Sequence, residues 1–235
     1  MISSPPRAGT SPRRSPSDPR PSPSDQDLPR IVTNPATGAV IADVAADGAT
    51  AVRRKYEAAR AGQARWALVP VARRLQAIAH FRERIVAMHE TLARTLTDEV
   101  GKPIRQSRNE LNGLLTRIDF FLEASTRALR GQKVFADATQ NLEERITHEP
   151  LGVIANISAW NYPYFVGSNV FVPALVAGNA VLYKPSEHAA LTGLHIAEML
   201  HEAGVPEDVF VPVIGAGATG AALLLQPVDG VFFTG

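Results

Sequence analysis

Three short motifs place polar side chains or glycines directly after apolar runs, where they could contact a bound ligand. They are Trp160-Asn161-Tyr162-Pro163, Lys184-Pro185-Ser186-Glu187 and Gly215-Ala216-Gly217-Ala218-Thr219-Gly220. The third has the G-x-G-x-x-G spacing, in which glycines let the backbone approach the pyrophosphate of a dinucleotide. Together the motifs indicate a dinucleotide site, with an amide, an ammonium and a carboxylate close by.

Each motif also has an ordinary structural explanation. The glycine motif could be a tight strand-to-helix turn, since the acidic residue normally found about 20 residues later is missing. Pro, Ser and Glu are common at helix starts, so the second motif could simply begin a helix. A carboxylate such as Glu187 at a strand end could instead accept hydrogen bonds from ribose hydroxyls. Asn161 fits a turn, although its amide could also donate to an oxyanion.

Apolar runs alternate with helical segments in the part of the chain that holds the motifs. The predicted strands are 152–159, 180–184, 209–214 and 231–234, and the helical segments between them are 164–177, 191–203 and 218–225. This alternation predicts βαβ units with a parallel, Rossmann-like sheet, and therefore an α/β fold. Residues that follow parallel strands meet at one edge of the sheet, so the three motifs should lie together.

The preceding residues predict a different organisation. Residues 1–30 are rich in Pro, Ser and Arg and predict a disordered tail rather than a targeting peptide, whereas 31–140 predict a hairpin followed by helices. The hairpin strands are 30–33 and 40–44, and the helices are 49–66, 71–99 and 104–130. Because helices near 30 residues are long for a globular protein, we expect internal breaks. A further strand is predicted at 142–148, within a connecting segment 141–150 that precedes the partial sheet domain 151–235.

Composition excludes several classes of protein. The net charge of +1 argues against a nucleic-acid partner, and no apolar run reaches the length of about 18 residues that suggests a membrane span. The sequence has no cysteine, which rules out disulfides and thiolate chemistry among these residues and fits a reducing compartment such as the cytoplasm. The six histidines show no ligand spacing, so no metal site is expected.

The motifs, taken in order, resemble the aldehyde dehydrogenase superfamily. Pro150-Leu151-Gly152-Val153 and Pro173-Ala174-Leu175-Val176-Ala177-Gly178-Asn179 frame the Trp-Asn-Tyr-Pro motif, and Lys184-Pro185-Ser186-Glu187 follows. Asn34-Pro35-Ala36-Thr37-Gly38, Gly101-Lys102-Pro103 and Phe233-Thr234-Gly235 match further landmarks. The resemblance covers about Ile31 to Gly235.

The resemblance implies roles for particular residues. Asn161 would supply half of an oxyanion hole, and Lys184 and Glu187 would hold the adenosine ribose. Because a carboxylate repels a 2′-phosphate, Glu187 favours NAD over NADP. The remaining residues expected at the cofactor are Ser158, Ala159, Trp160, Ser186, Gly217, Gly220 and Gly235. Residues 142–148 resemble an oligomerisation arm, so the full-length enzyme is expected to be a homo-oligomer.

In that family an aldehyde is oxidised to a carboxylic acid. A cysteine thiolate attacks the aldehyde, NAD(P) accepts the hydride, and a water activated by glutamate releases the acid. Neither that cysteine nor that glutamate can be placed here, and we expect both beyond Gly235. The chain therefore resembles the N-terminal half of such an enzyme, and we expect it to be inactive alone. The alternative is a dinucleotide-binding or structural remnant that has lost its chemistry.

Overall fold

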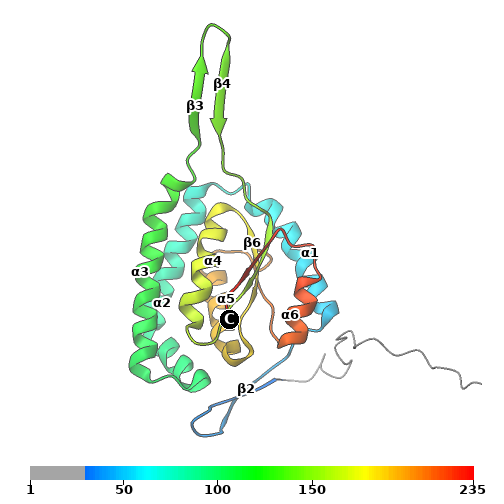
Figure 1. The fold of residues 1–235 in the computed structure, drawn as a ribbon. Coiled ribbons are helices and arrows are strands. Elements are labelled where there is room, and N and C mark those ends of the chain that lie inside the picture. Colours follow the sequence, from blue (N-terminus) through cyan, green and yellow to red (C-terminus); the bar gives the residue numbers. More distant parts are fainter. Residues whose placement is uncertain (1–29) are drawn as a thin grey trace, which may run out of the picture.

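The computed structural model describes residues 30–235, and the predicted tail lies outside these residues except for Arg30, which begins the first strand (Figure 1). The α/β class is confirmed, with helices first and a parallel sheet after them. No helix in residues 30–235 is long and apolar enough to cross a membrane.

A parallel sheet of four strands forms the centre of the molecule. The strands are β5 (Val153–Ile157), β6 (Ala180–Lys184), β7 (Phe210–Pro212) and β8 (Gly230–Phe233), in the order β7-β6-β5-β8. The helices between them are α4 (Pro163–Ala177), α5 (Ala190–Glu202) and α6 (Gly217–Leu224). Ile157 pairs in register with both Lys184 and Phe233. The carboxyl ends of β5, β6 and β8 are therefore level with one another.

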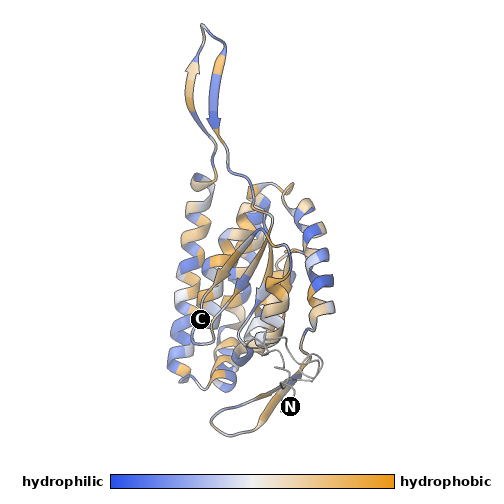
Figure 2. Cartoon of the chain, turned by 45° about the vertical axis from the view of Figure 1, so that its right-hand side comes forward, coloured by the Kyte–Doolittle hydropathy of each residue, from blue (hydrophilic) through white to orange (hydrophobic). Residues whose placement is uncertain are grey.

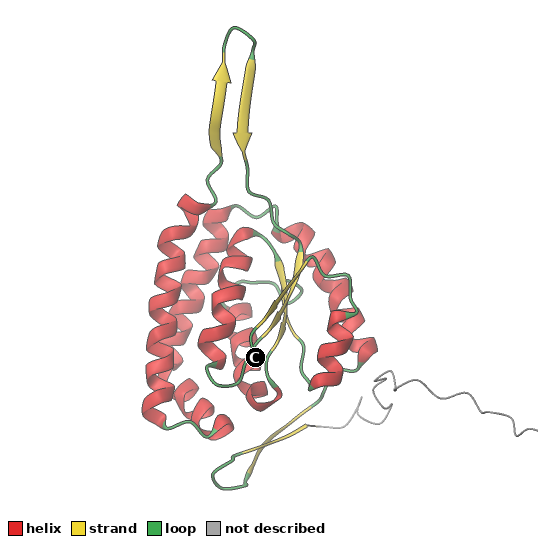
Figure 3. Cartoon of the chain, in the orientation of Figure 1, coloured by secondary structure: helices red, strands yellow, loops and turns green. Residues whose placement is uncertain are grey.

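Helices cover both faces of this sheet (Figure 3). Helix α1 (Ala49–Trp66) packs with α6 on one face, and α4 and α5 lie on the other, beneath α2 (Val71–Val100) and α3 (Ile104–Ala128) (Figure 1). Side chains alternate between the two faces along each strand: Val181 and Tyr183 join the core under α4 and α5, whereas Leu182 joins the core under α1. Both faces are buried along β5 and β6, which explains the continuous apolar runs of these two strands, whereas Val231, Phe232 and Phe233 of β8 are exposed.

Helix α2 runs for 30 residues, so the expected internal break is wrong. Its sequence holds no Gly or Pro, and buried apolar side chains recur along it at Ile78, Phe81, Ile85, Leu92 and Leu96. Burial along the whole length therefore stabilises a helix longer than the average. The helix ends where Gly101 adopts a left-handed conformation, with φ of +77°.

Two antiparallel hairpins extend from the body (Figure 1). One pairs β1 (Arg30–Thr33) with β2 (Val40–Val44). The other pairs β4 (Leu142–Ile146) with β3 (Gln132–Asp137), a strand that the sequence patterns did not predict. We call this second hairpin the arm. Apart from a half-buried Asp137 its strands are exposed, and apolar and polar residues share its surface (Figure 2).

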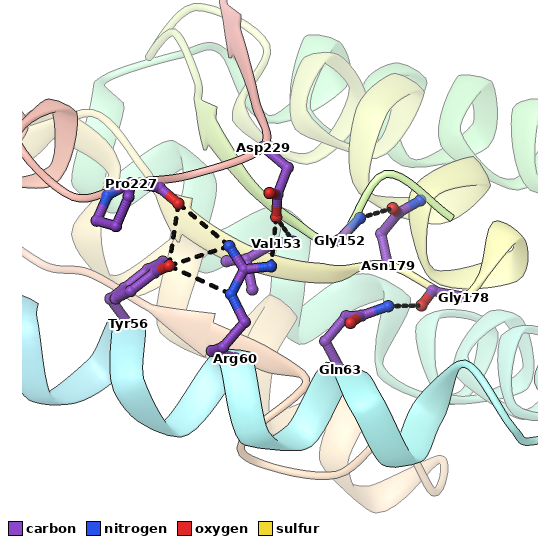
Figure 4. Close-up of polar contacts among 9 residues, drawn as sticks. All are labelled: Tyr56, Arg60, Gln63, Gly152, Val153, Gly178, Asn179, Pro227 and Asp229. Carbon is purple, nitrogen blue, oxygen red and sulfur yellow. Dashed lines mark hydrogen bonds and ion pairs between the residues drawn. The ribbon is translucent and has the colours of Figure 1, made fainter. Parts of the chain in front are cut away.

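The amino ends of the sheet strands carry a dense polar network (Figure 4). Asp229, just before β8, accepts a hydrogen bond from the Val153 N–H at 2.7 Å and pairs with Arg60 of α1 at 2.6 Å. Arg60 and Tyr56 both donate to the carbonyl of Pro227, at 3.1 and 3.0 Å. These bonds connect α1 to β5 and to the segment that leads into β8.

Two further side chains close the same end of the sheet. Asn179 accepts from the Gly152 N–H at 2.9 Å, and Gln63 of α1 donates to the Gly178 carbonyl at 3.2 Å. Gly152 has φ of +131°, and a Cβ there would overlap the Asp229 carboxylate. Only glycine fits at this position without strain.

Candidate functional site

A pocket of about 330 Å³ lies at the carboxyl ends of the sheet strands. We call it the strand-end pocket. It is lined by the last residues of β5, β6 and β8, by the segments that follow these strands, and by α6: Ile157, Ser158, Ala159, Trp160, Lys184, Ser186, Glu187, Gly217, Gly220, Leu224, Phe233, Thr234 and Gly235. All nine residues expected at the cofactor are among them, so the structure brings together segments almost 80 residues apart.

Backbone hydrogen bonds hold the strand ends at one level. The Ser158 N–H donates to the Lys184 carbonyl at 3.0 Å, and the Thr234 N–H donates to the Ile157 carbonyl at 3.0 Å. Each strand therefore stops beside its neighbour, and residues at or just after each stop line the same pocket. This register explains why residues of all three motifs lie at one pocket, although no single motif identifies a binding site.

Lys184 forms part of the pocket wall although it is 5% exposed. Its Nζ donates to the Pro185 carbonyl at 3.2 Å. A Cβ on Gly220 would lie 3.4 Å from Lys184 Cε, so the aliphatic stem runs against the backbone of α6. Glycine at 220 thus leaves room for the lysine and keeps this side of α6 flat.

Ser186 and Glu187 begin a helix, as one reading of the sequence predicts, and they also lie where a ligand could reach them. Ser186 Oγ accepts from the His188 N–H at 3.3 Å and so caps η2 (Glu187–Ala189), a short 3₁₀ helix before α5. Both side chains also line the strand-end pocket, where Glu187 is half-buried. At the rim, the Trp160 ring packs edge-on against His188 with centroids 6.4 Å apart.

The glycine motif likewise combines a turn with a pocket wall. Gly215 has φ of +152°, and a Cβ there would overlap Thr219 Oγ1, which donates to the Asp47 carbonyl at 2.9 Å. The Asp47 carboxylate also accepts from the Ile214 N–H at 2.7 Å. Gly215 therefore makes the tight turn, whereas Gly217 and Gly220 present bare backbone to the pocket.

The helix face that carries Gly217 and Gly220 continues to the last residue of α6. Leu224 also lines the strand-end pocket, although it was not predicted. It lies four residues after Gly220 and seven after Gly217, which is the spacing of one helical face. This spacing is the signal that could have identified it.

Asn161 is exposed and does not line the strand-end pocket. It lies between Trp160, which lines that pocket, and Tyr162, which lines a second one of about 280 Å³. We call the second the α3 pocket, because Gln106, Asn109, Glu110 and Gly113 of α3 line it with Tyr162 and Phe165. The Asn161 loop therefore separates two pockets.

Two side chains that the sequence did not single out as functional hold this loop. Lys102 donates to the Asn161 carbonyl, forms an ion pair with Glu110 at 2.5 Å, and lies 3.9 Å from the centre of the Tyr162 ring. Glu110 accepts from the N–H groups of Tyr164 and Phe165, at 2.8 and 3.3 Å. The lysine and the glutamate therefore fix the backbone at Asn161 and in the residues that follow it.

The Glu110 carboxyl is almost completely buried. Burial raises its pKa, while the hydrogen bond and charge of Lys102 and the two backbone N–H groups oppose that shift. Its position within the buried stripe of Leu111, Leu114 and Ile118 is the signal that could have marked it, since an isolated acid on such a stripe requires a partner.

A second buried glutamate supports the other helix of this layer. Glu99 of α2 accepts from the N–H groups of Leu191 and Thr192, at 2.6 and 2.9 Å, and from the Thr192 hydroxyl at 2.8 Å. Acids from α2 and α3 thus cap the amino ends of α5 and α4, where the helix dipole favours negative charge. Within residues 30–235, no group of three acidic, histidine or cysteine side chains is arranged to hold a metal ion.

Comparison with known proteins agrees with this geometry. The model of the aldehyde dehydrogenase family matches residues 23–235. N-succinylglutamate 5-semialdehyde dehydrogenase 1 of Caulobacter vibrioides is 37% identical over 207 residues, which are 87% of this chain and 43% of the relative.

Two solved structures show the same arrangement of elements. An NAD-dependent aldehyde dehydrogenase from Sinorhizobium meliloti has a TM-score of 0.78 and 31% identity, covering 88% of this chain and 41% of that one. An NADP-dependent enzyme from E. coli has a TM-score of 0.78 and 29% identity, covering 86% and 44%. The chain spans less than half the length of each of these relatives. The chain belongs to the aldehyde dehydrogenase family.

Proposed function

We propose that this chain is the cofactor-binding part of an aldehyde dehydrogenase that oxidises an aldehyde to a carboxylic acid with NAD as acceptor. Residues 151–235 would form the core of the cofactor domain, and 31–140 would form its hairpin and supporting helices. The observation that carries the proposal is the strand-end pocket, because the nine residues expected at a dinucleotide all line it.

The pocket residues fit the groups of a dinucleotide. Bound NAD(P) would supply the hydride acceptor. Glu187 can accept hydrogen bonds from two ribose hydroxyls, and the Lys184 ammonium can donate beside it. Gly217 and Gly220 leave a flat stretch of α6 against which a planar ring can pack, and Trp160 borders the opening. Gly235, which follows β8, lines the same pocket.

Glu187 supports NAD rather than NADP as the acceptor. A half-buried carboxylate beside the ribose would repel a 2′-phosphate, and it loses little of that effect to solvent. Family members of both kinds resemble this chain, one named as NAD-dependent and one as NADP-dependent. The preference for NAD over NADP therefore has to be measured on this chain.

The α3 pocket is the place that we propose for the aldehyde. The Asn161 loop lies between the two pockets, so an amide there can face an oxygen of the substrate while the cofactor occupies the other side. No cysteine is among the 235 residues, so the thiolate of the family reaction is not supplied by them. A relative is named for N-succinylglutamate 5-semialdehyde, which supports an aldehyde as the substrate class.

We also propose that the arm pairs with another copy of the protein. Both of its outer strand edges are open, and Val134, Phe135, Leu142 and Ile146 are exposed on it. A two-stranded hairpin is marginal by itself, and unpaired edges invite a further strand. Light scattering of the protein with the arm residues 132–146 replaced by a short Gly-Ser link should show a lower mass than the unaltered protein.

Calorimetric titration with NAD and with NADP tests the cofactor proposal. We expect the chain to bind NAD about tenfold more tightly, and Glu187→Gln to reduce that preference to about twofold, because the repulsion of the 2′-phosphate is lost. Glu198→Gln is the matched control, since Glu198 is exposed on α5 outside the pocket. Failure of the chain to bind either nucleotide would overturn the proposal.

A further inference from the structure

Arg117 lies on the helix face by which α3 lines the α3 pocket, one turn beyond Gly113, although it is not itself a lining residue. Asn109, Gly113 and Arg117 follow one another at intervals of four residues, so they share one face of the helix. The Arg117 guanidinium carbon lies 5.6 Å from the centre of the Phe165 ring, and Phe165 is itself a wall of the pocket. Arg117 therefore stands at the end of the pocket that is farther along α3.

The guanidinium of Arg117 lies between aromatic rings instead of beside an acid. Its carbon is also 5.9 Å from the centre of the Phe120 ring. Other arginines of these helices form ion pairs, Arg82 with Asp119 and Arg108 with Glu90. Across residues 30–235, no hydrogen bond or ion pair involves Arg117. Stacking on rings orients the planar group while leaving its N–H donors available.

The rest of the α3 pocket suits a chain with an anionic end. Gln106 and Asn109 add neutral amides, and Tyr162 and Phe165 add apolar surface. The one acid in the lining, Glu110, is already bound by Lys102 and by two backbone N–H groups. Its charge is thus compensated, and no other lining residue would repel an anion.

We infer that Arg117 binds an anionic group at the far end of the aldehyde, and that the site prefers aldehydes which carry such a group. This inference rests on the proposed placement of the aldehyde in the α3 pocket. The aldehyde end lies at the Asn161 loop, the carbon chain lies along Tyr162 and Phe165, and a carboxylate or phosphate accepts hydrogen bonds from the guanidinium fork. Arginine is well suited to this because its donors match both anions two at a time.

A matched pair of probes tests the inference on the 235-residue chain. Glutarate semialdehyde and pentanal have the same number of carbons and differ in the terminal carboxylate. Titration followed by NMR of the labelled chain should show tighter binding of the anionic probe by about fivefold, with shifts at the Gly113 amide and the Gln106 and Asn109 side chains. Added salt should reduce the difference.

Variants at Arg117 separate charge from packing. Arg117→Gln should remove the preference, whereas Arg117→Lys should keep part of it. Arg127→Gln is the control, since Arg127 is exposed on the last turn of α3 and should leave both affinities unchanged. If an Arg117 variant fails to fold, the preference of the unaltered chain and its salt dependence still decide the question.

The inference is overturned if the two probes bind equally, if neither binds at millimolar concentration, or if Arg117→Gln keeps the preference. Inorganic phosphate as a competitor tells the two anions apart: displacement by phosphate at lower concentration than by acetate indicates a phosphate site. NAD titration of the same samples keeps this result distinct from the cofactor proposal, because that binding takes place in the strand-end pocket and does not involve Arg117.

Discussion

The two ends of the central sheet are built differently. At the amino ends, side chains of α1 and of the loops bind one another and the backbone, as Arg60, Asp229 and Asn179 do (Figure 4). At the carboxyl ends, bonds between backbone groups hold the strands level, and glycines of α6 leave one wall bare. One end is closed by polar contacts, and the other is open for a ligand.

This difference implies that stability and binding can be altered separately. A change at the amino ends removes bonds that connect α1, β5 and β8, so it should lower the free energy of unfolding. A change in the lining of the strand-end pocket removes few internal contacts and should act on ligand affinity instead. The carboxyl ends nevertheless need support, and they receive it from Glu99 of α2, Glu110 of α3 and Lys102 in the turn between these helices.

The largest loss of stability is expected from Gly152→Ala. The new Cβ would overlap the Asp229 carboxylate, and alanine strongly disfavours φ of +131°. Strain and the broken network together should lower the free energy of unfolding by about 3 to 5 kcal/mol. Urea unfolding followed by circular dichroism measures this loss. A change smaller than about 1 kcal/mol would show that the network adapts easily.

A similar loss is expected from Lys102→Met, this time beside the open end. The substitution leaves the buried Glu110 carboxylate without its cation, which typically costs about 3 to 5 kcal/mol. The double variant Lys102→Met with Glu110→Gln should recover part of the stability, because the amide oxygen can still accept from the Tyr164 N–H. Thermal and urea unfolding of the single and double variants check this. Equal stability of both would contradict the role given to the ion pair.

A smaller loss is expected from Asp229→Ala, which leaves the Val153 N–H without its acceptor and Arg60 without its partner. We expect about 1 to 3 kcal/mol at neutral pH, because the side chain is partly exposed. Burial would raise the pKa of Asp229, but the hydrogen bonds from Arg60 and Val153 hold it below the ordinary value.

The lowered pKa fixes how this loss depends on pH. The ionised carboxylate stabilises the fold fully above the unfolded-state pKa of about 3.9, and that stabilisation is lost as pH falls through the lower pKa of the folded state. The unaltered chain and Asp229→Ala should therefore converge in stability under acid. Unfolding curves at a series of pH values measure the difference in stability between the two chains. A difference that stays constant down to acid pH would show that ionisation of Asp229 is not its cause.

The smallest effect is expected from Gly217→Ala. A Cβ at this position meets nothing within 4 Å, and alanine favours the helix that begins there. Stability should change by less than about 1 kcal/mol, in the stabilising direction. NAD affinity should fall, because a methyl group now projects from the flat wall. The comparison between the two ends fails if Gly217→Ala destabilises the chain as much as Gly152→Ala does.

Much of the fold follows from local patterns in the sequence. The β6 strand and the helix α1 have the predicted bounds, because glycines, prolines and changes of hydrophobic period mark their ends. The proximity of Ser158, Glu187 and Gly220 was also predictable, since parallel strands place their carboxyl ends together. A parallel sheet thus turns order in sequence into proximity in space.

Long-range polar contacts could not be predicted in the same way. Nothing near Glu110 or Glu99 in the sequence shows that each caps a helix more than 50 residues later. The contacts of Arg60 with Pro227 and Asp229 depend equally on how α1 packs against the sheet. Strand β3 was not predicted, because it begins with the polar residues Gln132 and Lys133. Its apolar residues face solvent, so it lacks the pattern of a buried strand.

The exposure of the arm has a consequence for motion. Amide protons exchange with water through the least costly opening that frees them, and an exposed hairpin can open while the sheet remains intact. We expect the amides of β3 and β4 to exchange within seconds in the isolated chain, and those of β5 and β6 only through global unfolding. Slow exchange in the arm would then report, residue by residue, when another strand has joined its edge.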